Sequence, residues 1–283
     1  MLETLYFLLL PVSACIILVG IFSYFGLHVL ARGVIFVDIS MAQIAALGTL
    51  VGMLVGIGQE SVFSYLFSVL FVGLAAAVFT FIRLEAREVP QEAIIGIVYG
   101  LSLAFSLFIA ELVPEGAGYI KETLTGSLLW VNWGKIALLG LVCAVIGIFH
   151  YVYRDRLIAL ARDKTQHTAP GARKWDFLFY FTLGLVVIEA VKIVGVFLVF
   201  SLLVVPASMA VMFYPGWKGR LVAAWVIGGS ASVLGTMASY RWNLPNAPFI
   251  VCLLGLALVV AALVKILLSR SVHAEDSGEY NRL

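Results

Sequence analysis

The chain has 283 residues, of which 63% are hydrophobic and 12% charged, with a net charge of +2 and a mean hydropathy of +1.08. A soluble domain carries about 25% charged residues, so this composition excludes an ordinary soluble protein. Apolar runs long enough to cross a bilayer recur throughout, and the alternating pattern of an outer-membrane barrel is absent. The sequence therefore predicts an all-α polytopic membrane protein that has the lipid bilayer around it and no nucleic-acid partner.

About eight or nine transmembrane helices are expected, each near the roughly 20 residues that a spanning helix needs. The two apolar runs around Gly195 are interpreted as a short hairpin with its turn outside. A transmembrane domain would cover 1–270, and 271–283 would form a polar cytoplasmic tail. The predicted spans are 5–27, 34–57, 61–82, 92–113, 134–153, 175–192, 194–213, 221–240 and 247–268.

The basic residues predict the orientation, because cytoplasmic loops carry an excess of Lys and Arg. With the N-terminus outside and the C-terminus in the cytoplasm, most of the 18 basic residues, including Arg32, fall in cytoplasmic segments. The opposite orientation reverses this bias. The segment 118–131 is too polar and too short to span, so it is expected to form a surface or re-entrant helix on the outer side.

Two groups of small residues describe packing. Gly48, Gly52 and Gly56 form a GxxxGxxxG ridge on the second span, and small residues crowd the span over 221–240. Small residues let helix backbones approach closely in lipid. The ridges could be sliding or dimer surfaces, or they could serve ordinary packing within the chain.

Few polar residues interrupt the spans, and these are the candidates for a substrate pathway: Asp38, Ser40, Gln43, Glu189 and Lys192. A lone charge in hydrocarbon costs about 2.5–3.5 kcal/mol on insertion scales, so each needs a reason. Asp38 has two interpretations, a hard oxygen ligand for a divalent cation or an acidic residue favoured by a helix N-terminus. Glu189 and Lys192 share one helix face, so they could neutralise each other, or Glu189 could face the pathway.

Catalytic patterns are absent from the sequence. It has no GxSxG or HExxH motif, no paired carboxylates within a span and no P-loop. His28 and His150 fall at span ends and are interpreted as interfacial residues. The chain is therefore expected not to be an enzyme, to bind no cofactor and to hydrolyse no ATP itself.

The stretch KIVGVFLVFSLLVVPASMA, beginning at Lys192, resembles the signature of the ATP-binding-cassette permeases for zinc, manganese and iron. A basic residue, VG, an aliphatic run with SLL and a Pro-Ala pair all match that signature. Residues 91–97 (QEAIIGI) resemble the family's E-D-T-A-I-G-I segment after the third span. A third segment, Gly118-Tyr119 through GSLL at 126–129, resembles its GYLFG-x-I-L segment.

Two departures concern the substrate and the ATPase partner. The family's second span usually carries Asp-x-x-x-His, whereas counting from Asp38 leads to Ala42, and alignment on the glycine ridge leads to Gln43. The imidazole is missing either way. The loop after the fifth span reads RDRLIALAR over 154–162, which is more basic than the family's F-D-x-E-x-A pattern.

The resemblance implies a type II ABC-importer-like permease that works as a homodimer in a bacterial-type cytoplasmic (inner) membrane. A separate cytoplasmic ATPase would use the ATP and drive alternating access, and an extracytoplasmic substrate-binding protein would deliver a divalent metal such as zinc, manganese or iron. The expected metal ligands are Asp38 and Glu189. The alternatives are a secondary carrier and a non-transporting membrane assembly partner. The expected contacts to the ATPase are Glu85, Arg87, Gln91, Glu92, Gly96, Arg156 and Arg162.

Overall fold

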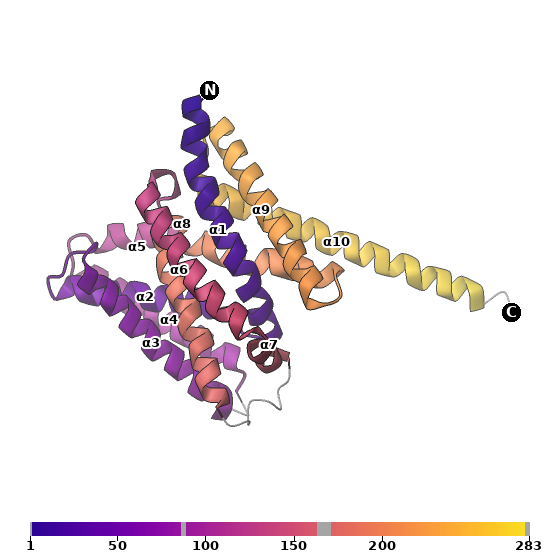
Figure 1. Cartoon of the computed structure of the whole chain (residues 1–283), viewed down its shortest axis with the longest axis horizontal. Helices are drawn as coiled ribbons and strands as arrows, with labels where there is room; N and C mark the ends of the chain where they lie inside the picture. Colours follow the sequence, from indigo (N-terminus) through magenta and orange to yellow (C-terminus); the bar gives the residue numbers. More distant parts are fainter. Residues whose placement is uncertain (1, 86–88, 163–170, 281–283) are drawn as a thin grey trace.

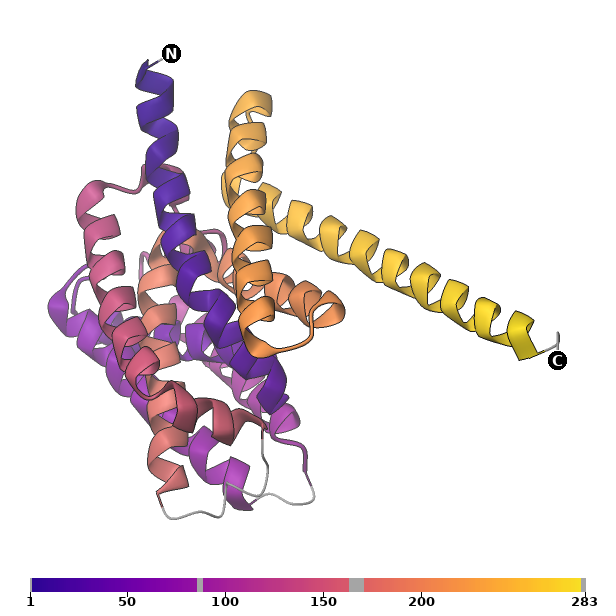
Figure 2. The same cartoon turned by 45° about the vertical axis from the view of Figure 1, so that its right-hand side comes forward.

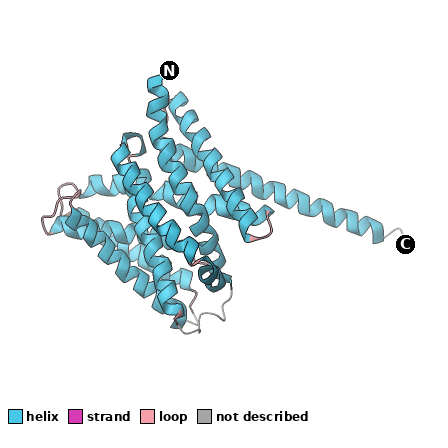
Figure 3. Ribbon diagram, in the orientation of Figure 1, coloured by secondary structure: helices cyan, strands magenta, loops and turns pink. Residues whose placement is uncertain are grey.

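The computed structural model describes residues 2–85, 89–162 and 171–280, and within these ranges every regular element is a helix (Figure 3). This confirms the all-α prediction. Where the connections lie within the described ranges they are short, and one of them contains a 3-10 helix, η1, between α5 and α6. The elements are α1 (Leu2–Arg32), α2 (Val37–Leu54), α3 (Val62–Glu85), α4 (Gln91–Ala110), α5 (Gly116–Thr125), η1 (Leu128–Trp130), α6 (Trp133–Val152), α7 (Arg154–Arg162), α8 (Ala172–Phe213), α9 (Trp217–Trp242) and α10 (Asn246–Tyr280).

Eight of these helices are long and apolar enough to cross a membrane, namely α1, α2, α3, α4, α6, α8, α9 and α10. The number agrees with the expected eight or nine. The exterior of the bundle is rich in exposed Leu, Val, Phe and Ile side chains, as a surface that faces lipid requires. α10 extends away from the other helices and is the least buried of the eight (Figures 1 and 2). It continues to Tyr280, so the predicted boundary at residue 270 is not marked by a helix end.

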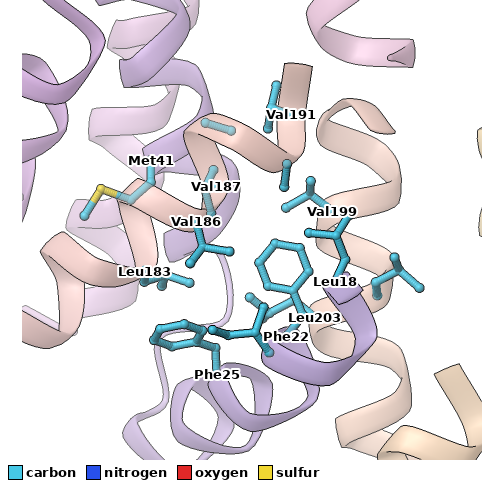
Figure 4. Packing of buried hydrophobic residues seen from close by; sticks show 14 of the residues in the cluster. Leu18, Phe22, Phe25, Met41, Leu183, Val186, Val187, Val191, Val199 and Leu203 are labelled. Atoms are coloured by element: carbon cyan, nitrogen blue, oxygen red, sulfur yellow. The ribbon is translucent and has the colours of Figure 1, made fainter. Parts of the chain in front are cut away.

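The core lies where α1, α2 and α8 meet (Figure 4). Three large side chains of α1 project into it: Leu18, Phe22 and Phe25. α8 supplies Leu183 and Val199 among many others, and nearly all of its length is lined by buried aliphatic residues. A helix that is apolar on every side is expected at the centre of a membrane bundle, because it has no face for water. α8 is therefore the element around which the other helices pack.

The hairpin predicted at Gly195 corresponds to a kink within α8. Its 42 residues form one element in which only Gly195 departs from helical dihedrals, with φ 79° and ψ 161°. The chain bends there without a loop, and the two halves leave in different directions (Figures 1 and 2). A positive φ is accessible to glycine because it has no Cβ. The break was located correctly, but its form, a single residue, was not.

Both ends of α8 lie at the same end of α1. Asp176, in the first turns of α8, is bonded to Arg32, the last residue of α1. Trp217, four residues after α8 ends, has its ring 4.7 Å from that of His28. The chain therefore enters and leaves α8 on one side of the bundle. Each half has about 20 residues, enough for one pass.

The segment expected as a short outer helix forms α5 and η1, and it packs against the bend of α8. Gly126 and Gly195 approach so closely that a Cβ on Gly195 would lie 2.4 Å from the Gly126 nitrogen. The Ser127 amide donates to the Ile193 carbonyl at 3.1 Å. This bond satisfies a carbonyl that the broken helix leaves without an intrahelical partner. The bend and the α5–η1 segment thus stabilise each other.

The glycine ridges serve packing between helices of the chain. Gly48 of α2 lies against the α3 backbone, where an added Cβ would meet the Phe67 carbonyl oxygen at 2.8 Å. Gly228 and Gly235 of α9 lie against Val19 of α1 and Ile250 of α10 respectively. Gly56 is not part of the ridge, because it follows α2 with φ +85° in open space.

Candidate functional site

The polar residues of α2 are buried near the beginning of that helix. Asp38, Ser40 and Gln43 are each at most 3% exposed. Neither carboxylate oxygen of Asp38 has a hydrogen-bond partner in the described part of the chain. A buried carboxylate in this state is costly, so Asp38 remains a candidate for the substrate pathway.

Glu92 lies beside Asp38 at the same end of the bundle. Its Oε1 atom accepts a hydrogen bond of 2.8 Å from the Phe36 amide, directly before α2 begins. A carboxylate at this position stabilises the unpaired amides and the positive end of the helix dipole. The structure therefore brings Glu92, an expected ATPase contact, next to Asp38, an expected pathway residue.

Glu189 and Lys192 form the second polar group, near the bend of α8. Their side chains are 3.9 Å apart, with Glu189 buried and Lys192 half-exposed. The Lys192 ammonium also lies 4.5 Å from the centre of the Tyr65 ring of α3, and Tyr65 interacts with Glu189. The mutual neutralisation that the spacing allowed is present. Tyr65 is the member of this group that sequence reasoning missed.

The two groups lie at different depths. Gln91, adjacent to Glu92, donates a 3.0 Å hydrogen bond to the Tyr180 hydroxyl of α8. From Tyr180 to Glu189 the helix rises about 14 Å at about 1.5 Å per residue. No cluster of three or more His, Cys, Asp or Glu residues occurs in the described ranges. Asp38 and Glu189 are thus not brought into one site within this chain, and their assignment as metal ligands stays a prediction.

A buried ion pair, unforeseen from the sequence, joins α1 to α8. The Arg32 guanidinium donates to Asp176 at 2.6 Å, and both side chains are fully buried. The guanidinium also lies 4.0 Å from the centre of the Phe179 ring. Arg32 is therefore not the exposed loop residue that the orientation argument assumed. The one feature of the sequence that could have indicated this pair is the carboxylate of Asp176, which stands at the start of the long apolar stretch that forms α8.

The two histidines expected at the interface are buried next to this ion pair. His150 of α6 bonds to Thr182 at 2.8 Å and to the Tyr24 hydroxyl at 3.3 Å. His28 of α1 is packed between the rings of Tyr24 and Trp217. Their burial corrects the interfacial interpretation. Because both rings belong to the core, they connect α1, α6, α8 and α9 at one end of the bundle.

The residues expected to contact an ATPase have different environments. Gln91 and Glu92 have partners within the chain, whereas Gly96 of α4 and Arg156 of α7 are exposed. Arg87 and the side chains of Glu85 and Arg162 lie outside the described part. α7 packs Leu157, Leu160 and Ala161 into the bundle, whereas Arg154 and Arg156 are exposed.

Polar contacts also gather at the opposite end, around α5. Lys135 lies 3.6 Å from Glu60, and Gln59 donates to Glu122 at 3.4 Å. Tyr119 of α5 interacts with Thr49 and Thr123, and burial raises the pKa of its phenol. This hydroxyl therefore stays neutral and acts as a hydrogen-bonding group.

Comparison with known proteins gives the family. The model of the ABC 3 transport family matches residues 5–265. The chain is 24% identical over 177 residues to a "Probable metal transport system membrane protein" of Chlamydia muridarum, an alignment that covers 62% of the chain and 60% of that protein. It is 24% identical over 242 residues to the "Manganese import system permease protein ScaB" of Streptococcus gordonii, with 83% of each covered.

The fold is also found among solved structures. The structure described as "PsaBC from Streptococcus pneumoniae in complex with Fab" is similar with a TM-score of 0.75 and 20% identity, over 90% of both chains. At this identity the similarity concerns the fold alone. The family match covers nearly the whole chain, which contains the three motifs and the eight spanning helices described above. The chain belongs to the ABC 3 transport family.

Proposed function

We propose that this chain is the membrane-spanning permease of an ABC importer for divalent metal ions. The observation that carries the proposal is the family match over residues 5–265. Relatives named for manganese and metal transport support the class of cargo. Manganese or iron suits this chain better than zinc, because its polar spanning residues offer oxygen ligands and the second span has no histidine.

The pathway in this proposal contains two groups of polar residues at different depths. Asp38, near Glu92, lies at the end of the bundle marked by Arg32. Glu189 lies near the bend of α8, and the helix rises about 14 Å from Tyr180 to Glu189 at about 1.5 Å per residue. A cation held by one carboxylate at a time is released more readily than one held by a complete ligand set, which is what a transporter needs. A second copy of the chain would add the same carboxylates from its own α2 and α8.

The partners follow from the two ends of the bundle. A cytoplasmic ATPase would bind at α7, where Arg154 and Arg156 are exposed, and at the α3–α4 connection, and it would supply the ATP hydrolysis. A substrate-binding protein would dock at the opposite end, near Glu60 and α5. The N-terminus would then lie outside and the C-terminus inside a bacterial cytoplasmic membrane. A homodimer would place the pathway along its two-fold axis, and alternating access would open it to one side at a time.

The test is uptake measured metal by metal in cells that lack this chain and its ATPase. Manganese or iron uptake is expected to fail in these cells and to return only when the chain and the ATPase are supplied together. Restoration by the chain alone would contradict the proposal and favour a secondary carrier. Unchanged uptake of every divalent metal in the deletion strain would reject metal as the cargo.

A further inference from the structure

A groove lies between the end of α3 and the beginning of α8. Its volume is about 240 Å³, and it is open to the surroundings of the bundle. Three residues of α3 and three of α8 form its walls: Ala77, Thr80, Phe81, Arg173, Lys174 and Phe177. None of the six carries a negative charge.

The walls of the groove present almost only carbon. The Thr80 hydroxyl donates to the Ala76 carbonyl at 2.7 Å, so it is already bonded within its own helix. Phe177 stacks on Phe181 with ring centres 5.6 Å apart, and Phe81 is more than half exposed. An apolar wall open to the bilayer offers favourable contact to an acyl chain and nothing to a hydrated ligand.

The mouth of the groove carries two basic residues and lies at the membrane boundary. Arg173 and Lys174 are exposed in the first turn of α8. The Arg173 guanidinium is 5.8 Å from the centre of the Phe81 ring. The first charged residue in the sequence of α3 is Arg83, two residues beyond Phe81, so the two cations lie at the level where lipid headgroups begin.

Two further arginines at this end pair with aromatic rings in the same way. Arg154 lies 4.7 Å from the Tyr151 ring, and Arg156 lies 5.5 Å from the Trp175 ring. Aromatic rings with basic side chains beside them are typical of the interface between hydrocarbon and headgroups. The groove is the place in this basic region where cations adjoin an apolar cavity.

We propose that this groove binds an anionic phospholipid of the surrounding bilayer. The phosphate of the lipid pairs with Arg173 and Lys174, and one acyl chain lies along Ala77, Phe81 and Phe177. Charge complementarity selects an anionic over a zwitterionic headgroup, since basic residues near a membrane surface attract acidic lipids. The lipid would connect α3 to α8, the helix that bends at Gly195. This inference is independent of what the protein transports.

The experiment measures lipid binding to the full-length purified chain by native mass spectrometry, with phosphatidylglycerol and phosphatidylcholine titrated separately. The double variant Arg173→Gln/Lys174→Gln is expected to weaken phosphatidylglycerol binding about 30-fold, since two basic residues at about 1 kcal/mol each amount to about 2 kcal/mol. The control Lys218→Gln/Arg220→Gln removes the same charge away from the groove and is expected to bind as the parent chain does. Ala77→Phe, which fills the groove but keeps both cations, is expected to weaken binding as well.

Three results would overturn the proposal. One is equal binding of both lipids by the parent chain. Another is undiminished phosphatidylglycerol binding by the double variant or by Ala77→Phe. The third is displacement of the lipid by inorganic phosphate at equal concentration, which would mean that only the phosphate is recognised. If the double variant instead lost the ATPase on co-purification but kept the lipid, the groove would be a protein-docking surface.

Discussion

At the scale of single residues, the Arg32–Asp176 pair makes the sharpest prediction about stability. Both side chains are fully buried at a distance of 2.6 Å. Removing one partner leaves an uncompensated buried charge, which costs about 3–5 kcal/mol. Asp176→Asn is therefore expected to lower the free energy of unfolding by about that amount in a denaturant titration of the purified protein.

The matched control for this variant is Asp155→Asn. Asp155 pairs with Arg154 at 3.7 Å but is 93% exposed, and exposed pairs contribute about 0–1 kcal/mol. Equal effects of the two substitutions would contradict the structural importance of the buried pair. Replacing both Arg32 and Asp176 with Leu is expected to recover part of the loss, because no unpaired charge then remains.

Glu189 carries the prediction about transport. Glu189→Gln keeps the size of the side chain and removes its charge, so metal uptake is expected to fall at least about tenfold if a carboxylate ligand contributes about 1.4 kcal/mol or more to passage. Assembly with the ATPase should be unchanged. Glu275→Gln is the control, because position 275 lies in the last turns of α10, which extends away from the other helices and from the proposed pathway. Normal uptake with Glu189→Gln would remove this residue from the pathway.

Sequence reasoning identified some of these residues and missed others for a physical reason. Asp38 and Glu189 stand out because a charge inside an apolar run is visible in the chain itself. The partners Tyr65 and Asp176 do not, because a tyrosine is common in any span and Asp176 comes just after two basic residues. Contacts between side chains of different helices depend on tertiary packing. They could not be inferred from this one sequence.

At the scale of elements, the bend of α8 depends on two glycines. Gly195→Ala would force a side chain into φ +79° and against the Gly126 nitrogen, 2.4 Å from the new Cβ. Strain of this kind costs about 1–3 kcal/mol per residue, so a comparable fall in unfolding free energy is expected. The free energy of unfolding is again measured by denaturant titration, and metal uptake is measured in parallel.

Gly20→Ala is the control for the bend. Gly20 lies inside α1 with no atom within 4 Å of an added Cβ, and alanine is favoured over glycine in a helix by about 1 kcal/mol. This variant is expected to be neutral or stabilising. A Gly195→Ala protein as stable as the Gly20→Ala protein would show that the bend tolerates a side chain.

Most of the helices were predictable, because length and apolar composition are local properties of the chain. The bend at Gly195 was located by its glycine, but its single-residue form was not. That form depends on the carbonyl of Ile193 finding the Ser127 amide, a contact between segments more than sixty residues apart. The short helix α5 was expected from its polarity, whereas its position against α8 was not.

At the scale of the whole molecule, the topology predicts which segments face each side of the membrane. Both ends of α8 lie near the C-terminal end of α1, so α7 and the α8–α9 turn belong to one side and Glu60 to the other. Single cysteines at positions 60, 156 and 218 test this with a membrane-impermeant thiol reagent on intact cells. Glu60→Cys should react at once, and Arg156→Cys and Lys218→Cys only after permeabilisation.

The control for this labelling is the chain without added cysteines, in which Cys15 and Cys143 are buried and Cys252 is replaced by serine. Labelling of Lys218→Cys in intact cells would mean that α8 crosses only once. Labelling of Arg156→Cys but not Glu60→Cys would reverse the proposed orientation and place the ATPase surface on the wrong side.

The central claim is that this chain forms the route for a divalent metal driven by a separate ATPase. The most direct measurement is accumulation of radioactive manganese and iron in vesicles that contain the purified chain with its ATPase and substrate-binding protein. The account predicts accumulation that requires ATP and all three proteins and that falls with Glu189→Gln but not with Glu275→Gln. Accumulation without ATP, or none of any divalent metal with the complete assembly, would contradict it.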